Sequence, residues 1–316
     1  MKYSIGILFF MCTTQGATVP FLLQELHILK DFPLQKPEFI TASDGCKLAY
    51  YSYVPENPRS FVVFYHGAGF YSGALYQYFA KQLAEEHSIG CYLFDIRGHG
   101  ASQGPRGDTP TTKQVFDDVT TAIDFVGGTH PHIPVFLGGH SSGGGLVLTY
   151  SAGNNHPLLK GSLLIAPYLG RNSEALKSHA NPASSFIKSV RVWVFIVNGI
   201  TGGYLCNHTP AVFFNYPPHL LQNHPLIVTS YTPAMLAATS PESPRELFVK
   251  LTKPIALFAA EHDEQFDAQK LLMYKKCLPE VGVAHSVFAQ IPHAHHLDCM
   301  LHAARYCASF ISQSLC

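Results

Sequence analysis

Charged residues are scarce in this chain. Only 13% of its 316 residues are Asp, Glu, Lys or Arg, and 21 basic side chains balance 21 acidic ones. Proteins that bind nucleic acid present a basic face, so this composition speaks against a nucleic-acid partner. Hydrophobic residues make up 47%, which is enough to fill the core of one large α/β domain that carries an insertion.

The cysteines lack a metal-binding pattern. Although the chain has eight of them, no two form a CxxC pair and their spacing fits no zinc site. We expect most of them to be buried as small hydrophobic residues. Internal repeats and low-complexity tracts are also missing, which excludes repeat architectures.

Long apolar runs are missing too. The N-terminal run Ile5–Cys12 is too short to span a membrane; it follows Lys2 and precedes the small residues Gly16 and Ala17. This layout is typical of a secretory signal peptide, predicted here over residues 1–17. It favours a secreted or periplasmic protein. The alternative is an attached apolar first helix, with a cytoplasmic or membrane-associated location.

Strand-like and helix-like segments alternate over residues 18–166 and again over 251–316, the two predicted parts of the core. The predicted strands are 47–55, 60–67, 89–95, 133–139, 161–167, 253–263 and 285–292. The predicted helices are 74–87, 112–126, 142–152, 267–278 and 297–315. Alternation with nearly continuous apolar strands predicts an α/β fold with a mostly parallel sheet covered by helices on both faces.

The alternation stops over residues 167–250, which we predict to form an inserted cap or lid. Its most unusual part is the apolar stretch 185–200, "SFIKSVRVWVFIVNGI", which contains Lys188 and Arg191. Two cations make it a poor membrane span. It could instead touch a lipid interface transiently, as amphipathic segments do. The alternative is a cap helix packed on its own domain.

A glycine-rich turn joins the predicted strand 133–139 to the helix 142–152. Gly139-His140-Ser141-Ser142-Gly143 fits the nucleophile elbow G-x-S-x-G, in which side chains two residues either side of the serine would collide. A phosphate-binding loop is excluded because no lysine follows. The same pattern surrounds Ser102, but no helix can begin there. We therefore predict Ser141 as the nucleophile, a simple packing turn being the alternative.

A serine nucleophile needs a base, and the base needs an orienting carboxylate. In this architecture the acid follows the serine in the chain and precedes the histidine. Asp263 closes the predicted strand 253–263 and is the best candidate. Glu261 is expected to lie within that strand, and Asp267 to begin the next helix.

The base is expected in the loop after the last strand, "IPHAHHLDCM". It offers His293, His295 and His296, and His296 directly precedes the final helix. We predict His296 as the base and keep His295 as the second choice. Histidine-rich tracts also suggest metal binding, but no carboxylate or cysteine pattern accompanies this one, so we expect no metal and no cofactor.

An oxyanion hole completes such a site with two backbone N–H groups. Ser142, which follows the nucleophile, would supply one of them. The loop "HGAG" after the strand 60–67 would supply the other, and the best donor there is the amide of Ala68.

Five separated segments resemble one family. They are "HGAGFYSGALYQYFAKQLAEE", "DIRGHGASQG", "GGHSSGG", "AAEHDEQFD" and "IPHAHH", and they occur in the family's order. They look like the monoglyceride lipase and lysophospholipase branch of the α/β-hydrolase fold, also called the serine aminopeptidase family. The resemblance covers most of residues 40–166 and 250–300.

The resemblance implies the same site residues. It places the nucleophile on Ser141, the acid on Asp263, the base on His296, and the oxyanion amides on Ala68 and Ser142. The family motif that contains Asp95, Arg97 and His99 is interpreted as structural, ordering a turn near the site.

Two departures from the family stand out. Phe70 occupies a position where the family often has Glu, and it would alter acyl-group binding as a substrate-binding residue. Ser142 stands where many relatives have Met. Neither change removes a main-chain donor.

These features predict a serine hydrolase that cleaves a lipid monoester, a monoacylglycerol or lysophospholipid, through an acyl-enzyme on Ser141. A general carboxylesterase, amidase or peptidase with the same triad is the alternative. A peptidase that recognises a free amino terminus would want acids in the cap, and residues 168–250 contain only Glu174, Glu242 and Glu246. A non-catalytic binding protein would be expected to lose a triad member, and none is missing.

Overall fold

The computed structural model describes residues 29–315 except 30, 179–184 and 280–284. The predicted signal peptide over residues 1–17 lies outside the described residues. Eight strands form the main sheet in the order β1-β2-β4-β3-β5-β6-β10-β11. Their bounds are β1 Glu38–Thr41, β2 Lys47–Tyr53, β3 Ser60–Tyr65, β4 Ile89–Phe94, β5 Val135–His140, β6 Leu159–Ile165, β10 Ile255–Ala260 and β11 Val287–Ile291.

The sheet is parallel from β4 to β11, and β1 and β2 are antiparallel at one edge. All seven predicted strands are present. The sequence patterns did not indicate β1, because it is a short edge strand on which only Ile40 is buried. The expectation that Glu261 lies within a strand is wrong. Strand β10 ends at Ala260, and Glu261 opens the following turn.

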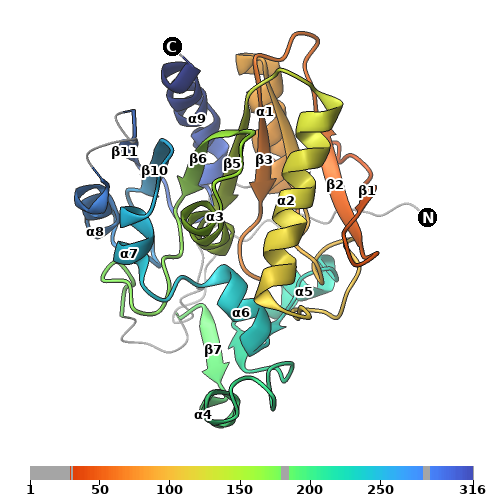
Figure 1. Ribbon diagram of the computed structural model, residues 1–316, viewed down its shortest axis with the longest axis vertical. Coiled ribbons are helices and arrows are strands. Elements are labelled where there is room, and N and C mark those ends of the chain that lie inside the picture. Colours follow the sequence, from red (N-terminus) through yellow and green to blue (C-terminus); the bar gives the residue numbers. More distant parts are fainter. Residues whose placement is uncertain (1–28, 30, 179–184, 280–284, 316) are drawn as a thin grey trace.

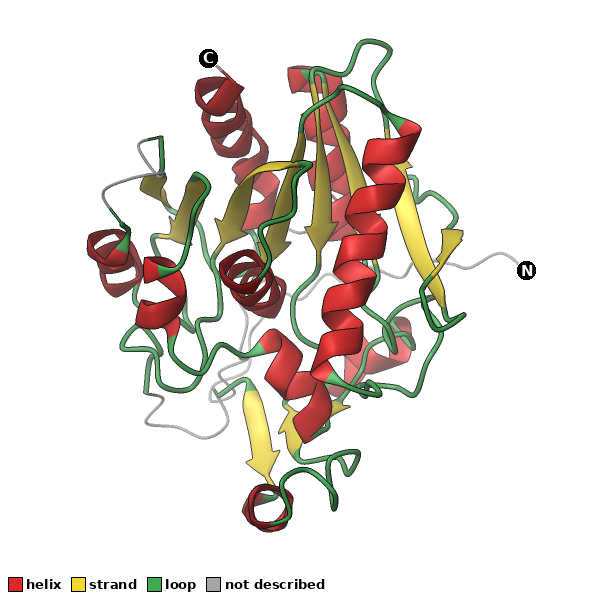
Figure 2. Cartoon of the chain, in the orientation of Figure 1, coloured by secondary structure: helices red, strands yellow, loops and turns green. Residues whose placement is uncertain are grey.

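Helices cover both faces of the sheet (Figures 1 and 2). On one face lie α2 (Thr112–Thr129) and α3 (Ser142–Gly153), and on the other lie α1 (Ala74–His87) and α9 (Cys299–Leu315). The apolar residues of α1 and α2 that face the sheet are buried; they include Leu75, Phe79 and Leu83 of α1 and Val115, Val119, Ile123 and Val126 of α2. The segment predicted as one helix over 267–278 is α8 (Ala268–Met273) followed by a 3-10 turn, and Asp267 caps its start as expected.

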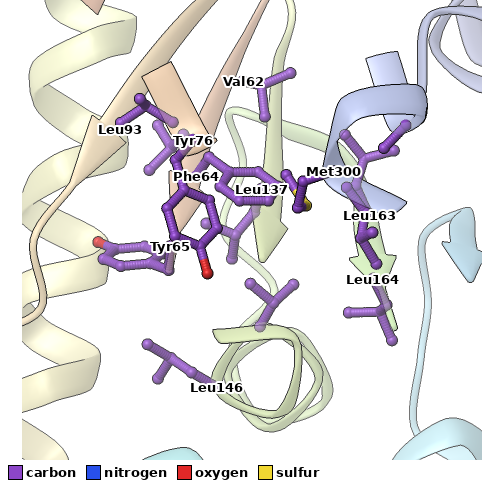
Figure 3. Packing of buried hydrophobic residues seen from close by; sticks show 14 of the residues in the cluster. Val62, Phe64, Tyr65, Tyr76, Leu93, Leu137, Leu146, Leu163, Leu164 and Met300 are labelled. Atoms are coloured by element: carbon purple, nitrogen blue, oxygen red, sulfur yellow. The ribbon is translucent and has the colours of Figure 1, made fainter. Parts of the chain in front are cut away.

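The core lies between the sheet and its helices. Every residue of β3, β4 and β5 is buried, which explains why these strands are nearly continuous apolar runs. Figure 3 shows the side chains of the central strands packed between Leu146 of α3 and Met300 of α9. The parallel strands are therefore packed on both faces up to their carboxyl ends.

The segment predicted as a cap has its own secondary structure. Its elements are β7 Ile187–Val190, α4 Val192–Ile200, β8 Val212–Phe214, α5 Pro218–Asn223, β9 Ser230–Tyr231, α6 Pro233–Thr239 and α7 Pro244–Val249. The three strands form a separate antiparallel sheet, which sequence patterns did not indicate. Helix α6 packs against α2 and α3, so the end of this segment rests on the core. In the described part of the chain no helix has the length and apolar character needed to cross a membrane.

The six cysteines within the described residues are free. Three are buried and three are partly exposed; the buried ones are Cys91, Cys299 and Cys307. Half of the described cysteines are therefore buried, fewer than the majority that was expected.

Candidate active site

Ser141 occupies a strained turn between β5 and α3. Its backbone has φ 53° and ψ −120°, a conformation that non-glycine residues adopt rarely and mainly at functional sites. A Cβ on Gly139 would lie 2.3 Å from the carbonyl carbon of Gly143, and a Cβ on Gly143 would lie 2.4 Å from the carbonyl oxygen of Tyr65. Both flanking positions of the elbow therefore require glycine, as the sequence pattern predicted.

The structure brings the three predicted residues Ser141, His296 and Asp263 together. The His296 Nε2 atom lies 3.0 Å from Ser141 Oγ, and its Nδ1 atom lies 2.9 Å from Asp263 Oδ2. The side chains of His296 and Asp263 are 3% and 0% exposed, while Ser141 is half-buried. Three loops, after β5, β10 and β11, supply them, which is why 155 residues of sequence separate the serine from the histidine.

The Asp263 carboxylate is fixed by the turn that carries it. Its Oδ1 atom accepts hydrogen bonds from the backbone N–H groups of Gln265 (2.8 Å) and Phe266 (3.0 Å), which leaves Oδ2 for His296. Glu264 accepts a hydrogen bond from the His296 N–H at 3.0 Å. Sequence reasoning did not indicate Glu264 or Phe266, because contacts between distant loops leave no local pattern.

The environment of His296 favours its protonated form. Burial opposes the charge, but the Asp263 carboxylate and its hydrogen bond outweigh burial and raise the pKa of His296 above its ordinary value of 6.5. The Asp263 carboxylate would also hold a proton on Nδ1, so that Nε2 faces Ser141 as an acceptor. This is the arrangement a general base requires.

His295, the second choice for the base, points elsewhere. Its Nδ1 atom lies 3.2 Å from Asp298 Oδ2, and its N–H donates to Asp298 Oδ1 at 2.5 Å. The contact with Ser141 belongs to His296, so the geometry selects His296.

The two predicted oxyanion donors flank the serine. Ser142 is the first residue of α3, where backbone N–H groups have no partner within the helix. Gly67 packs so closely that a Cβ on it would lie 3.2 Å from Ser141 Cβ, which places the neighbouring Ala68 beside the nucleophile. Among the described residues neither the Ala68 N–H nor the Ser142 N–H donates to another group.

A tyrosine–histidine pair holds the loop before Ala68. The Gly67 N–H donates to the Tyr76 hydroxyl (2.9 Å), which lies 3.0 Å from Nδ1 of His140. Nε2 of His140 lies 2.9 Å from the His296 carbonyl oxygen. A carbonyl only accepts, so Nε2 carries the hydrogen, Nδ1 is free to accept, and the tyrosine donates to it. The chain of bonds therefore connects the loop that precedes Ala68 to the backbone of His296.

A second pair holds the loop after Ala68. The Gly69 N–H donates to the Tyr231 hydroxyl (2.9 Å), and Tyr231 donates to Nε2 of His99 (2.8 Å). Nδ1 of His99 donates to the Arg97 carbonyl oxygen at 3.0 Å. Burial lowers the pKa of His99 and of His140 well below the usual value, so both are neutral relays rather than charged groups.

Asp95 orders the turn below this loop. Its two carboxylate oxygens accept hydrogen bonds from the N–H groups of Ser72 (2.6 Å) and Ala101 (2.8 Å). The Ser102 hydroxyl donates to the Asp95 carbonyl oxygen (2.7 Å) and accepts from the Ala49 N–H (2.8 Å). The second G-x-S-x-G pattern thus holds a buried structural serine.

Arg97 of the same motif is also structural. Its buried guanidinium pairs with Asp118 at 2.6 Å and with Asp44 at 2.9 Å, and so ties the turn to α2 and to the β1–β2 connection. Together with Asp95 and His99 it has the turn-ordering role that the sequence indicated.

Phe70 faces an aromatic group contributed by the segment predicted as a cap. Its ring packs edge-on against Tyr216, with centroids 5.5 Å apart. Phe214 continues this group, because it packs edge-on against both Tyr216 (6.2 Å) and Tyr231 (4.9 Å). The Tyr216 hydroxyl donates to the Ala68 carbonyl at 2.5 Å. Aromatic rings therefore lie beside the loop that carries Ala68 and against Phe70, the residue predicted to alter acyl-group binding.

The fold and this site define an α/β-hydrolase, and the sequence match is specific. Residues 56–299 match the serine aminopeptidase family S33, which is most of the chain. The protein belongs to that family.

Its named relatives include lipases. The chain is 32% identical to monoacylglycerol lipase of Mycolicibacterium smegmatis over 109 residues, which cover 34% of this chain and 38% of that protein. It is 30% identical to human monoglyceride lipase over 148 residues, 46% of this chain and 48% of that protein. The match thus spans less than half the length of these two relatives.

Solved structures share the fold over a longer range. A soluble variant of monoglyceride lipase from Saccharomyces cerevisiae, solved with a substrate analogue, superposes with a TM-score of 0.67 and 16% identity. The superposition covers 90% of this chain and 96% of that one. At this identity the likeness concerns the fold.

We predict that Tyr76→Phe lowers kcat/KM about tenfold or more. The change leaves the buried Gly67 N–H and His140 Nδ1 without a partner. Each unsatisfied buried group lowers the free energy of unfolding by about 1–3 kcal/mol. Steady-state kinetics on an ester substrate and thermal unfolding would measure both effects. Tyr50→Phe is the matched control, because it removes one hydroxyl bonded to Glu38 on β1 and should leave kcat/KM unchanged. Equal kcat/KM in both variants would show that the hydrogen bonds of Tyr76 to Gly67 and His140 do not support the site.

We predict that kcat/KM falls on the acid side of an apparent pKa above 6.5. His296 must be neutral to accept the serine proton, so activity is present above its raised pKa and is lost as the pH falls through it. A pH–rate profile measures this. His295→Gln should keep both the rate and the profile, whereas His296→Gln should abolish turnover; the reverse result would assign the base to His295.

Proposed function

We propose that the protein is a serine hydrolase that cleaves carboxylic esters of lipids, with monoacylglycerols or lysophospholipids as substrates. One observation carries the proposal: the hydrogen-bonded chain from Asp263 through His296 to Ser141 ends beside two unengaged backbone donors. This is the arrangement that acyl transfer requires. The monoglyceride lipases among the relatives support the lipid ester as the substrate class.

The geometry supports a two-step reaction. Ser141 Oγ attacks the ester carbonyl carbon while His296 Nε2 takes the hydroxyl proton, and the Ala68 and Ser142 N–H groups stabilise the oxyanion. His296 then gives the proton to the leaving alcohol as the C–O bond breaks. Water attacks the acyl-enzyme in the same way, which releases the fatty acid and restores the serine. Asp263 stabilises the imidazolium in both steps.

The aromatic rings beside the loop that carries Ala68 favour an uncharged acyl group. Phe70 lies there against the buried rings of Phe214 and Tyr216, and burial raises the pKa of the Tyr216 hydroxyl well above its ordinary value, so it stays neutral. None of these three side chains has a carboxylate that could pair with a free ammonium group of a substrate. This favours a lipid ester over an aminopeptidase substrate within the same family.

We predict that a fluorophosphonate labels Ser141 and that long-chain monoacylglycerol is hydrolysed faster than a short-chain ester or an aminoacyl amide. Ser141→Ala should lose label and turnover, by roughly 10⁶-fold in kcat. Peptide mapping and a comparison of monoacylglycerol, lysophosphatidylcholine, short ester and amide would measure this.

Ser102→Ala is the matched control for the labelling. It removes two buried hydrogen bonds and should cost about 1–3 kcal/mol of stability while the label stays on Ser141. Activity that survives in Ser141→Ala would refute the mechanism. A faster short ester would instead indicate a general carboxylesterase, and absence of label with no turnover would indicate a binding protein.

We also propose that α4 touches the lipid surface from which the substrate comes. Helix α4 carries no charged residue, and of its nine residues only Val194 is buried. Trp193 and Ile196 are each 55% exposed, and Ile200 is 82% exposed. Figure 1 shows the helix at the end of the molecule farthest from the main sheet. An exposed apolar helix of this kind suits shallow insertion at a lipid interface.

We predict that phosphatidylcholine vesicles shift the emission of Trp193, the single tryptophan of the sequence, to shorter wavelength. Ile196→Ser combined with Ile200→Ser should weaken vesicle partitioning about tenfold or more, since each buried side chain contributes about 1.5–3 kcal/mol. Val249→Ser with Met273→Ser, two exposed apolar residues outside α4, is the matched control and should partition normally. Equal partitioning of both pairs would contradict the proposal.

The N-terminal sequence is the basis for a proposal about where the protein acts. The short apolar run after Lys2 supports export, so we propose that the enzyme acts outside the cytoplasm.

A further inference from the structure

Two histidines and a glutamate meet on the surface beside the triad. Glu261 and His262 form the turn after β10, and His293 lies in the turn after β11. The Glu261 Oε2 atom lies 3.7 Å from His293 Nδ1 and 4.0 Å from His262 Nε2. One nitrogen of each ring and one carboxylate oxygen all lie within 4.8 Å of one another.

These groups are the ligands that zinc prefers. Two imidazoles and a carboxylate with an open fourth position form a known type of three-residue zinc site. Bonds of about 2.0–2.1 Å to a tetrahedral ion require ligand atoms roughly 3.4 Å apart, so the side chains must close by about 1 Å. They are free to do so, because the side chains of Glu261, His262 and His293 are 36%, 53% and 89% exposed.

Backbone hydrogen bonds already fix the two turns against each other. The Glu261 N–H donates to the Ile291 carbonyl (3.1 Å), and the His262 N–H donates to the Ala294 carbonyl (2.8 Å). The Glu261 carboxylate accepts the His293 N–H at 2.7 Å. The ligand-bearing backbone is thus in place before an ion arrives.

We propose that Glu261, His262 and His293 bind a divalent transition-metal ion of the zinc class, which clamps the turns that carry Asp263 and His296. His262 directly precedes Asp263, and His293 lies three residues before His296. The sequence indicated no metal because no carboxylate accompanied the histidine tract. The fold supplies one from 32 residues upstream. The ion is a structural clamp and takes no part in ester cleavage.

The test is a zinc titration of the full chain after dialysis against a chelator. Isothermal titration calorimetry should show one saturable Zn²⁺ site, and zinc should raise the unfolding temperature. His293→Asn should weaken binding by at least the roughly tenfold that loss of a supporting zinc contact costs, and should remove the thermal shift. Asparagine suits this position because His293 has φ 59°, which Asn tolerates.

A matched control is available in the turn between α2 and β5. His132 is also an exposed histidine with a positive φ, 70°, and His132→Asn should bind zinc like the wild type. Glu261→Gln keeps an acceptor for the His293 N–H and should also weaken binding. Equal affinity in His293→Asn and His132→Asn, or no binding by the wild type, would overturn the proposal. Calorimetry reads the site even if the protein hydrolyses no ester.

Discussion

The close approach of α3 to the ends of β3 and β5 is the constraint on which the site depends. Gly143 lies so near the carbonyl oxygens of Tyr65 and His66 that any side chain on it would overlap them. This contact forces the chain to turn sharply at Ser141 and to adopt a positive φ there. The strained turn aims the hydroxyl away from the sheet, toward the loops that carry His296 and Ala68. A looser helix would leave the serine without its partners.

The same residue type has different roles because its surroundings differ. Burial lowers the pKa of His66, His99 and His140, whose hydrogen bonds within the described residues go to backbone groups and tyrosine hydroxyls, so they act as neutral links. His296 is as deeply buried, yet the carboxylate of Asp263 raises its pKa. The contact with Asp263 therefore distinguishes His296, the proposed base, from the structural histidines near it. His140 and His296, whose ring centroids lie 5.0 Å apart, show the contrast most directly.

The loop that contains Ala68 connects the core to the segment predicted as a cap. Tyr76 from α1 holds Gly67, and Tyr231 from β9 holds Gly69. The Gly69 carbonyl also accepts the Val228 N–H at 2.8 Å. A displacement of residues 228–231 would therefore move the loop that carries Ala68, the proposed oxyanion donor.

The sequence by itself determined seven of the eight strands of the main sheet, the helices that cover it and the three residues proposed as the catalytic triad. Buried parallel strands are continuous apolar runs, and the elbow requires glycines at fixed offsets, so both leave local patterns that can be recognised. Ser141 and Asp263 could be chosen because each ends such a run. The sequence favoured His296 over His295 only because His296 directly precedes the final helix. The contact of its Nε2 atom with Ser141 Oγ supports that choice.

Only the tertiary structure decided the rest. The edge strand β1 and the sheet of the cap are short and half-exposed, so their patterns are weak. Tyr76, Tyr231 and His140 act through partners 64 to 162 residues apart in the chain, and such pairs leave no periodic signal. Glu261 meets His293 only because β10 and β11 are adjacent and parallel, which brings their following turns to one edge.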